Sequence, residues 1–288
     1  MNYLRFLPFY LLSLLPFRVL YLISDVTFFL IYHVLGYRSK VVYRNLEVAF
    51  PHKTKKELKE IAKKFYKHFC DLFFEAIKLL TVDTKEIQKR FKVHDLSKIH
   101  YHLHNKENIL LYTAHQGNWE WLTTVPIYFD VHCNTLYKPL KNAYFNDLFI
   151  LIRQRFNVHC IPSQEAYRKL LTLKNQGIVA MNCVIGDQSP PVKSGRVESL
   201  FFDHKTTFFN GAAKIAKKTD AVVLLPYLKK EKRGTYELFF ETIVEKAKQV
   251  GEQEIVELYS KKLEDVIEAY PELYLWTHKR WKRDGIKY

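Results

Sequence analysis

Cysteine is scarce in this chain: there are 4 among 288 residues, Cys70, Cys133, Cys160 and Cys183. No two of them form a Cys-x-x-Cys pair, which excludes the common zinc and redox motifs. Four thiols in a chain of this length also do not make a disulfide scaffold. We therefore expect buried, reduced thiols in a reducing compartment, and we do not expect Cys183 to act as a nucleophile.

Glycine and proline are also few, with 9 and 10 residues. This scarcity excludes fibrous and low-complexity segments, and we find no linker composition and no internal repeat. Hydrophobic residues make up 48% of the chain and charged residues 26%, which excludes global disorder. The length is sufficient for one large domain with a sizeable core.

Acidic residues are in deficit, with 30 Asp and Glu against 45 Lys and Arg, a formal charge of +15. This balance implies an anionic partner: nucleic acid, an acidic membrane surface or an acidic carrier protein. The basic, tryptophan-containing stretch 276–283 (WTHKRWKR) would suit either of the first two in isolation. No helix-turn-helix, RNA-binding sheet or zinc finger signature is present, so nucleic acid is not an expected partner.

No uninterrupted run of about 20 apolar residues is present, the length that clearly predicts a membrane span. The apolar run 7–37 is interrupted by Arg18 and Asp25. A helix over 11–35 would nevertheless reach across a bilayer core at about 1.5 Å per residue. Arg18 and Asp25 would then share one helix face, where they would pair or point into a protein groove.

We interpret residues 1–38 as a membrane-embedded or interfacial anchor, followed by a single domain over 39–288. Arg38, Lys40 and Arg44 follow the apolar run and suit a cytoplasmic anionic surface. The absence of a small-residue cleavage site argues against a signal peptide that is removed. The alternative is a buried core helix.

The domain itself reads as an α/β fold with a mostly parallel or mixed sheet flanked by helices, because short apolar strands alternate with helical patterns. Thr54 and Glu57 have the spacing of a capping box at the start of a long helix. We predict strands at 108–114, 134–137, 178–184, 221–227 and 236–240. We predict helices at 57–80, 119–127, 142–156, 164–174, 211–219, 253–270 and 271–282. His100, His102 and His104 alternate as they would on one strand face, but no carboxylate or cysteine nearby completes a metal site.

The stretch 113–121 (TAHQGNWEW) carries the most chemical information. His115 follows an apolar strand and precedes a helix, the place where α/β folds bind ligands. If the chain folds back at Gly117, the carboxylate of Glu120 can hold one imidazole nitrogen, and the other nitrogen is free to take a proton from a hydroxyl. Such a dyad without a serine suits direct attack of an acceptor hydroxyl on an activated acyl group. A purely structural His and Glu pair is the alternative.

Further positions are expected to contact substrate. Gly117 permits close approach of the backbone and exposes N–H groups, and Asn118 adjoins it. Asp187 and Gln188 follow a strand and would bind substrate or orient the loop, unless they form a simple turn with Ser189. Asn210 and Gly211 open a helix whose N–H groups could meet an oxyanion or phosphate; a plain helix cap is equally compatible.

The motif HQGNWE (115–120) resembles that of the membrane glycerolipid acyltransferase superfamily. More closely, the chain resembles the late acyltransferases of lipid A biosynthesis, the lauroyl and myristoyl type. The blocks that carry this resemblance occur in the family's order and cover about 40–285. They are VVYRNLEVAFP (41–51), LYKPLKN (136–142), GDQSP (186–190), FFDHKTTFFNGAAKIAKKTDAVVLLPY (201–227) and LYLWTHKRWKR (273–283).

This resemblance implies an inner-membrane enzyme facing the cytoplasm, which moves a fatty acyl chain from acyl carrier protein to a hydroxyl of a lipid A precursor. It implies no cofactor and no metal, and it makes His115 the general base with Glu120 as its orienting partner. Lys138 stands where the family often has arginine, so it lacks the bidentate fork there. Arg153 and Arg155 match family positions for basic residues beside the site, although a solvated helix face would also explain them.

Two other functions remain open. One is the same acyl transfer onto an aminolipid or a lysophospholipid. The other is a catalytically idle module that binds membrane surfaces through its basic face; the intact pair of His115 and Glu120 argues against it. Acyl chain length, the choice between carrier protein and coenzyme A, and the oligomeric state are left open by the sequence.

Overall fold

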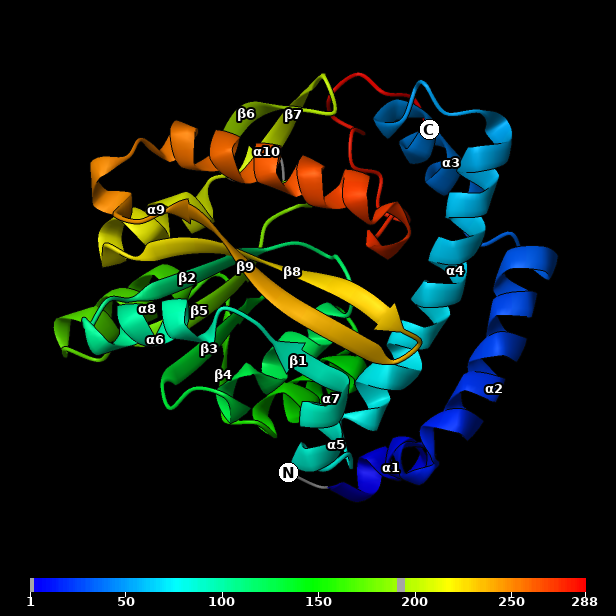
Figure 1. The fold of residues 1–288 in the computed structure, drawn as a ribbon, viewed down its shortest axis with the longest axis horizontal. Helices are drawn as coiled ribbons and strands as arrows, with labels where there is room; N and C mark the ends of the chain where they lie inside the picture. The colour runs from blue at the N-terminus through cyan, green and yellow to red at the C-terminus, as the bar shows by residue number, and fades with distance from the viewer. Residues whose placement is uncertain (1–2, 191–194) are drawn as a thin grey trace.

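The computed structural model describes residues 3–190 and 195–288. Its centre is a sheet in the order β1-β9-β8-β2-β5-β3-β4, covered by helices on both faces (Figure 1). The strands are β1 (Phe91–Val93), β2 (Ile109–Thr113), β3 (His132–Tyr137), β4 (Val158–Pro162), β5 (Ala180–Ile185), β8 (Val222–Lys232) and β9 (Thr235–Val244). A separate antiparallel hairpin pairs β6 (Arg196–Phe201) with β7 (His204–Phe209).

Most neighbouring strands of the large sheet are parallel. Parallel pairs join β8 to β2, β2 to β5, β5 to β3 and β3 to β4, whereas β9 returns antiparallel to β8. The short strand β1 then pairs parallel with β9 at the edge. The predicted α/β class with a mostly parallel sheet is therefore confirmed, and β2 lies in the middle of the sheet with every residue buried.

Helices surround this sheet. The α-helices are α1 (Leu7–Leu14), α2 (Phe17–Phe28), α3 (Ser39–Ala49), α4 (Lys55–Lys78), α5 (Thr84–Arg90), α6 (Leu96–His104), α7 (Ala143–Gln154), α8 (Ala166–Asn175), α9 (Gly211–Thr219) and α10 (Glu252–Ala269). Short 3-10 helices are η1 (Tyr3–Phe6), η3 (Trp119–Ile127), η4 (Ala247–Gln249) and η5 (Pro271–Leu273), and η2 (Phe29–Val34) is a π-helical turn. Helix α4 begins with the predicted capping box of Thr54 and Glu57.

Three predicted elements differ from the structure. The single helix over 11–35 is broken at Pro16, which cannot donate the backbone hydrogen bond that would continue α1 into α2. The helix over 271–282 stops after η5, because its backbone N–H groups bond elsewhere, as Leu275 does to the His115 carbonyl. The three alternating histidines lie on helix α6, not on a strand.

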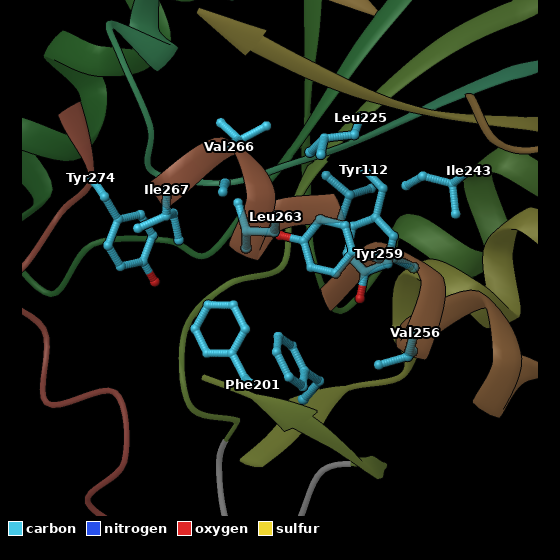
Figure 2. Close-up of a cluster of buried hydrophobic side chains, with 14 of the residues drawn as sticks. Tyr112, Phe201, Leu225, Ile243, Val256, Tyr259, Leu263, Val266, Ile267 and Tyr274 are labelled. Carbon is cyan, nitrogen blue, oxygen red and sulfur yellow. The ribbon is translucent and has the colours of Figure 1, made fainter. Parts of the chain in front are cut away.

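A buried aromatic and aliphatic cluster holds α10 between the large sheet and the β6–β7 hairpin. Figure 2 shows residues of α10 such as Tyr259 and Leu263 between Leu225 of the sheet and Phe201 of the hairpin. The rings of Tyr259 and Tyr112 stack with centroids 3.7 Å apart, and the Tyr259 hydroxyl donates to the Thr113 carbonyl at 2.8 Å. The carboxyl end of β2, where the loop bearing His115 begins, is therefore fixed by α10, which packs on one face of the sheet.

Candidate active site

The loop after β2 is held in place by the segment near the C-terminus. The His115 carbonyl accepts a hydrogen bond from the Leu275 N–H at 3.0 Å, and the Gly117 N–H donates to the Leu273 carbonyl at 2.8 Å. Gly117 has a φ of +60°, and a Cβ atom there would lie 2.4 Å from Cβ of Leu228. Only glycine fits this turn without strain, because both the backbone conformation and the space exclude a side chain. The turn directs the His115 side chain toward a cavity.

The carboxylate beside His115 is that of Asp187. Oδ1 of Asp187 lies 2.8 Å from Nδ1 of the ring and also accepts the His115 backbone N–H at 3.2 Å. The register explains the meeting: Thr113 of β2 lies opposite Ile185 of β5, so the residues two positions further on emerge side by side. An ionised carboxylate only accepts hydrogen bonds, so Nδ1 carries the proton and Nε2 presents a lone pair.

Glu120 has a different partner from the one expected, which corrects the predicted role as the partner that orients His115. It lies in η3, and its carboxylate forms a bidentate ion pair with Arg153 of α7, at 2.7 Å and 3.0 Å. Both side chains are largely buried. Burial lowers the pKa of Arg153, but the charge of Glu120 outweighs it, so the pKa is raised above its usual value. The expected chain reversal at Gly117 does occur; it turns Glu120 toward α7.

Asp187 is kept ionised by its surroundings. Its side chain is only 2% exposed, and burial alone would raise its pKa. The charge and hydrogen bond of His115, followed by the Arg280 guanidinium, outweigh burial and hold the pKa below its usual value. Arg280 is itself fully buried, with Cζ 4.3 Å from the centre of the Phe208 ring, and it donates to the Thr207 carbonyl at 3.0 Å.

A cavity of about 1280 Å³ opens beside His115. Its inner wall is apolar and includes Leu111, Val125, Cys133, Val158 and Met181, all of which belong to the hydrophobic core below the sheet. His115, Glu120, Arg153 and Gln188 line the same space. The Gln188 amide nitrogen lies 3.4 Å from both ring nitrogens of His115. The cavity therefore combines a proton acceptor with a deep apolar trough.

Cations also line the cavity, and sequence reasoning identifies only some of them. Lys138 and Arg153 are among the predicted residues; the others are Lys141, Lys214, Lys282 and Arg283. Gly211 lines it too, at the first turn of α9. Because helix N-termini and cations both favour anions, this part of the cavity suits a ligand with negative charges at one end and an apolar chain at the other.

Five predicted substrate contacts are not among the residues that line the cavity: Asp187, which pairs with His115, and four others. Gly117 shapes the turn, and Asn118 is completely buried, donating to the Glu75 carboxylate at 2.6 Å. Arg155 donates to the Leu79 carbonyl at 2.6 Å on the far side of α7. Asn210 is largely buried and donates to Glu252 at 3.3 Å. These four positions support the surrounding fold in this structure, and their contact with substrate stays a prediction.

The stretch 276–283 contributes to the site more than its composition suggests. Trp276, Arg280 and Trp281 are buried, so this stretch is not simply a basic surface. It holds the loop that carries Asp187: the Ser189 N–H donates to Nε2 of His278 at 3.2 Å, and the Ser189 hydroxyl donates to the Arg280 carbonyl at 2.7 Å. No local pattern shows these contacts, because they join segments about 90 residues apart.

The four cysteines are unpaired thiols, as expected. Burial raises the pKa of Cys183 to about 12, so the thiolate needed for nucleophilic attack is rare at neutral pH. Cys183 and Cys133 serve as part of the cavity wall.

A histidine fixed by a buried carboxylate at the edge of an apolar trough suits an enzyme that acts on acyl chains. Comparison with known proteins specifies the class. Residues 2–283 match the family described as bacterial lipid A biosynthesis acyltransferase. The chain is also 22% identical over 281 residues to a lipid A biosynthesis acyltransferase of Haemophilus influenzae, an alignment covering 96% of this chain and 86% of that protein. The chain belongs to the bacterial lipid A biosynthesis acyltransferase family, whose members transfer acyl groups in lipid A synthesis.

Proposed function

We propose that this enzyme transfers a fatty acyl chain from an acyl carrier protein thioester to a hydroxyl of a lipid A precursor, at the cytoplasmic face of the inner membrane. The observation that carries the reaction is the pairing of His115 with Asp187 at the edge of the apolar cavity. Nε2 of His115 removes the proton from the acceptor hydroxyl as its oxygen attacks the thioester carbon. The tetrahedral oxyanion then collapses, and the carrier thiol leaves with a proton.

Asp187 takes the role of orienting partner in this proposal. A fixed tautomer keeps the lone pair of Nε2 toward the acceptor, and the negative charge stabilises the imidazolium that forms. General-base catalysis of this kind contributes about 10²–10⁴-fold to the rate. Neither a metal nor a covalent intermediate is needed for a thioester that is already activated.

The cations that line the cavity stabilise the negative charges of the reaction. Lys138 and Arg153 are the groups we assign to the oxyanion, where one donor is worth about 3–4 kcal/mol. Glu120 holds Arg153 by two hydrogen bonds and so fixes its direction. Lys141, Lys214 and Lys282, with the start of α9 at Gly211, suit the phosphates of a lipid A precursor.

The apolar wall, the net charge and the N-terminal segment fit the acyl donor and the membrane. The apolar wall buries the acyl chain, and each buried methylene contributes about 0.8 kcal/mol. An acidic carrier protein is attracted by the net charge of +15. Residues 1–38 attach the enzyme to the membrane, supported by one segment, Phe17–Val34, that is long and apolar enough to cross a bilayer.

Mass spectrometry of lipid A tests this function in cells with and without the chain. We expect one secondary acyl group to disappear on deletion and to return with the wild type but not with His115→Ala. Unchanged lipid A on deletion would contradict the acceptor and direct the search to aminolipids and phospholipids. With purified enzyme, matched acyl-carrier-protein and acyl-coenzyme A donors decide the donor: equal kcat/KM for the two would contradict the assignment of the carrier protein.

A further inference from the structure

Helix α2 is tied lengthwise to the rest of the enzyme. In Figure 1, α2 and α4 run side by side over most of the length of α2. Their contacts pair Tyr21 with Glu75 and Ser24 with Asp71, and Tyr32 of the following turn η2 lies against Tyr66. The partner number falls as the α2 number rises, so the two helices are antiparallel. Any position of α2 in a membrane must therefore also accommodate α4.

The middle of the apolar segment Phe17–Val34, near the end of α2, carries a charge bound to the catalytic domain. The Asp25 carboxylate forms a bidentate ion pair with Arg233, at 2.8 Å and 3.0 Å, and Arg233 also binds the buried carboxylate of Asp71. Arg233 lies in the turn between β8 and β9, next to Gly234. A Cβ atom on Gly234 would overlap the Tyr21 hydroxyl, so this turn and α2 are fitted closely together.

Lysines flank α2 at the same level. Nζ of Lys67 lies 3.9 Å from the Asp25 carboxylate, and the Lys67 side chain is 53% exposed. Lys64 of α4 and Lys232 at the end of β8 are also exposed. If the segment Phe17–Val34 crossed a bilayer, its midpoint near Asp25 and these charges would lie in the hydrocarbon, where charged side chains are costly and rare.

The outer face of the N-terminal helices is apolar. On α2 the buried residues Phe17, Leu20 and Ser24 face α4, and large apolar side chains occupy the opposite face. The exposed ones form a stripe along η1, α1, α2 and η2: Leu4, Leu7, Leu11, Leu14, Val19, Leu22, Val26, Phe29, Leu30 and Val34. An apolar stripe with charges along its sides is the pattern of a helix that lies in the plane of a membrane interface.

This stripe leads toward the cavity. Helix α1 and η1 pack on α7: Phe9 and Phe145 have ring centroids 6.1 Å apart, and Arg5 forms an ion pair with Asp147 at 2.8 Å. Leu140, which lines the cavity, and Phe145 are themselves exposed. A bilayer leaflet that covers the stripe therefore also meets the apolar rim of the cavity.

From these contacts we infer that residues 4–35 do not cross the membrane but lie in the plane of one leaflet, with the apolar stripe in the lipid and the cavity rim at the membrane surface. This inference rests on the proposed attachment to a membrane and adds its geometry. Lipid substrates then enter the cavity sideways from the leaflet. The charge cluster of Asp25, Arg233 and Asp71 stays at the level of the head groups.

A depth measurement on the full-length enzyme tests this geometry. Val19→Cys, Val26→Cys and Val34→Cys place a fluorophore at three points of the stripe, and Lys64→Cys is the control outside it. The native thiols compete little, because burial raises their pKa to about 11 or 12. Each labelled protein is bound to vesicles of phosphatidylethanolamine and phosphatidylglycerol that contain lipids brominated at a shallow or a deep position.

The two geometries predict different profiles. Val19 and Val34 are separated by about 22 Å along a helix axis at 1.5 Å per residue. In the plane of the leaflet, the three stripe positions share one shallow depth, about 5–10 Å below the head groups, and Lys64→Cys stays in water. A spanning helix would put Val26 deepest and bring Lys64→Cys into reach of the lipid, which would overturn the inference. Equal absence of quenching at all positions would instead contradict membrane attachment itself, and the in-plane geometry with it.

Discussion

His115 and Asp187 are 72 positions apart in the chain, yet Nδ1 of the ring lies 2.8 Å from Oδ1 of the carboxylate. Adjacent parallel strands create this contact, because β2 and β5 end at the same edge of the sheet in matched register. The carboxylate of the HQGNWE motif, Glu120, points away to Arg153. The site thus contains two separate carboxylate pairs that line or adjoin one cavity, and they can be tested separately.

Asp187→Asn is expected to remove the orienting charge while keeping the shape of the side chain. The amide can present an N–H to Nδ1 and so favour the wrong tautomer of His115. We expect kcat to fall about 10²–10⁴-fold with a small change in KM. Steady-state kinetics with acyl carrier protein donor measures this, with circular dichroism to check the fold. Activity within a few-fold of wild type would contradict the role of Asp187.

Glu120→Gln is expected to act through Arg153 and to cost stability as well as activity. Breaking a largely buried ion pair leaves an uncompensated charge, at about 3–5 kcal/mol in the free energy of unfolding. The double variant Glu120→Gln with Arg153→Met removes both charges and should recover most of that stability but not the activity. Urea denaturation in detergent and kinetics on the same samples separate the two effects.

A matched control for this pair lies on α10. Lys261 and Asp265 form an exposed ion pair at 4.0 Å. Asp265→Asn should change the free energy of unfolding by less than about 1 kcal/mol, because solvent screens exposed pairs.

One outcome would contradict a role of the Glu120 and Arg153 pair in catalysis. If the double variant Glu120→Gln with Arg153→Met regained full activity along with stability, the pair would be structural only.

Much of the catalytic strand and its loop could be predicted from local pattern. Residues 109–112 are an apolar run, and Gly117 marks a turn two positions after His115, so the position of His115 at the end of a buried strand followed directly. The start of α4 was also predictable, because Thr54 and Glu57 carry their own capping signal. Such features depend on neighbours a few residues away.

The orienting carboxylate was not predictable in the same way. Asp187 is recognisable as a residue after a strand. Its contact with His115, however, depends on β5 lying beside β2, and the order of strands in the sheet cannot be predicted from neighbouring residues. The same holds for Arg280 and His278, whose basic and aromatic neighbours suggest a surface helix. Pro16 was the available signal that the N-terminal helix is broken, and the long apolar run obscured it.

Gly117→Ala is expected to disrupt the loop that carries His115. The φ of +60° costs about 1–2 kcal/mol for a residue with a side chain, and the overlap with Leu228 adds about 1–3 kcal/mol. Gly177→Ala is the matched control, because Gly177 has a φ of +72° and a Cβ atom there would have no other atom within 4 Å. Gly177→Ala should lose only the stability that the positive φ costs, and the enzyme should keep its activity.

The comparison of the two glycine variants isolates the steric part. Adding Leu228→Gly to Gly117→Ala removes the Cβ atom that the new methyl group would meet at 2.4 Å, so the double variant should lose less activity than Gly117→Ala alone. Denaturation and kinetics on the four proteins measure this. Equal effects of Gly117→Ala and Gly177→Ala on activity would contradict the view that the turn at Gly117 positions His115.

His278 should make the enzyme less stable in mildly acidic solution. Burial lowers its pKa to about 4 from 6.5, and its Nε2 accepts the Ser189 N–H. Between these two pH values the unfolded chain binds a proton that the folded chain does not, so stability is present above about pH 6.5 and is lost as the pH falls toward 4. With allowance for partial exposure, the loss is about 1–2 kcal/mol. His278→Gln keeps an acceptor but no titrating group, so its free energy of unfolding should fall less than that of the wild type between pH 7 and pH 5. Parallel pH profiles for the two proteins would contradict a lowered pKa of His278 in the folded enzyme.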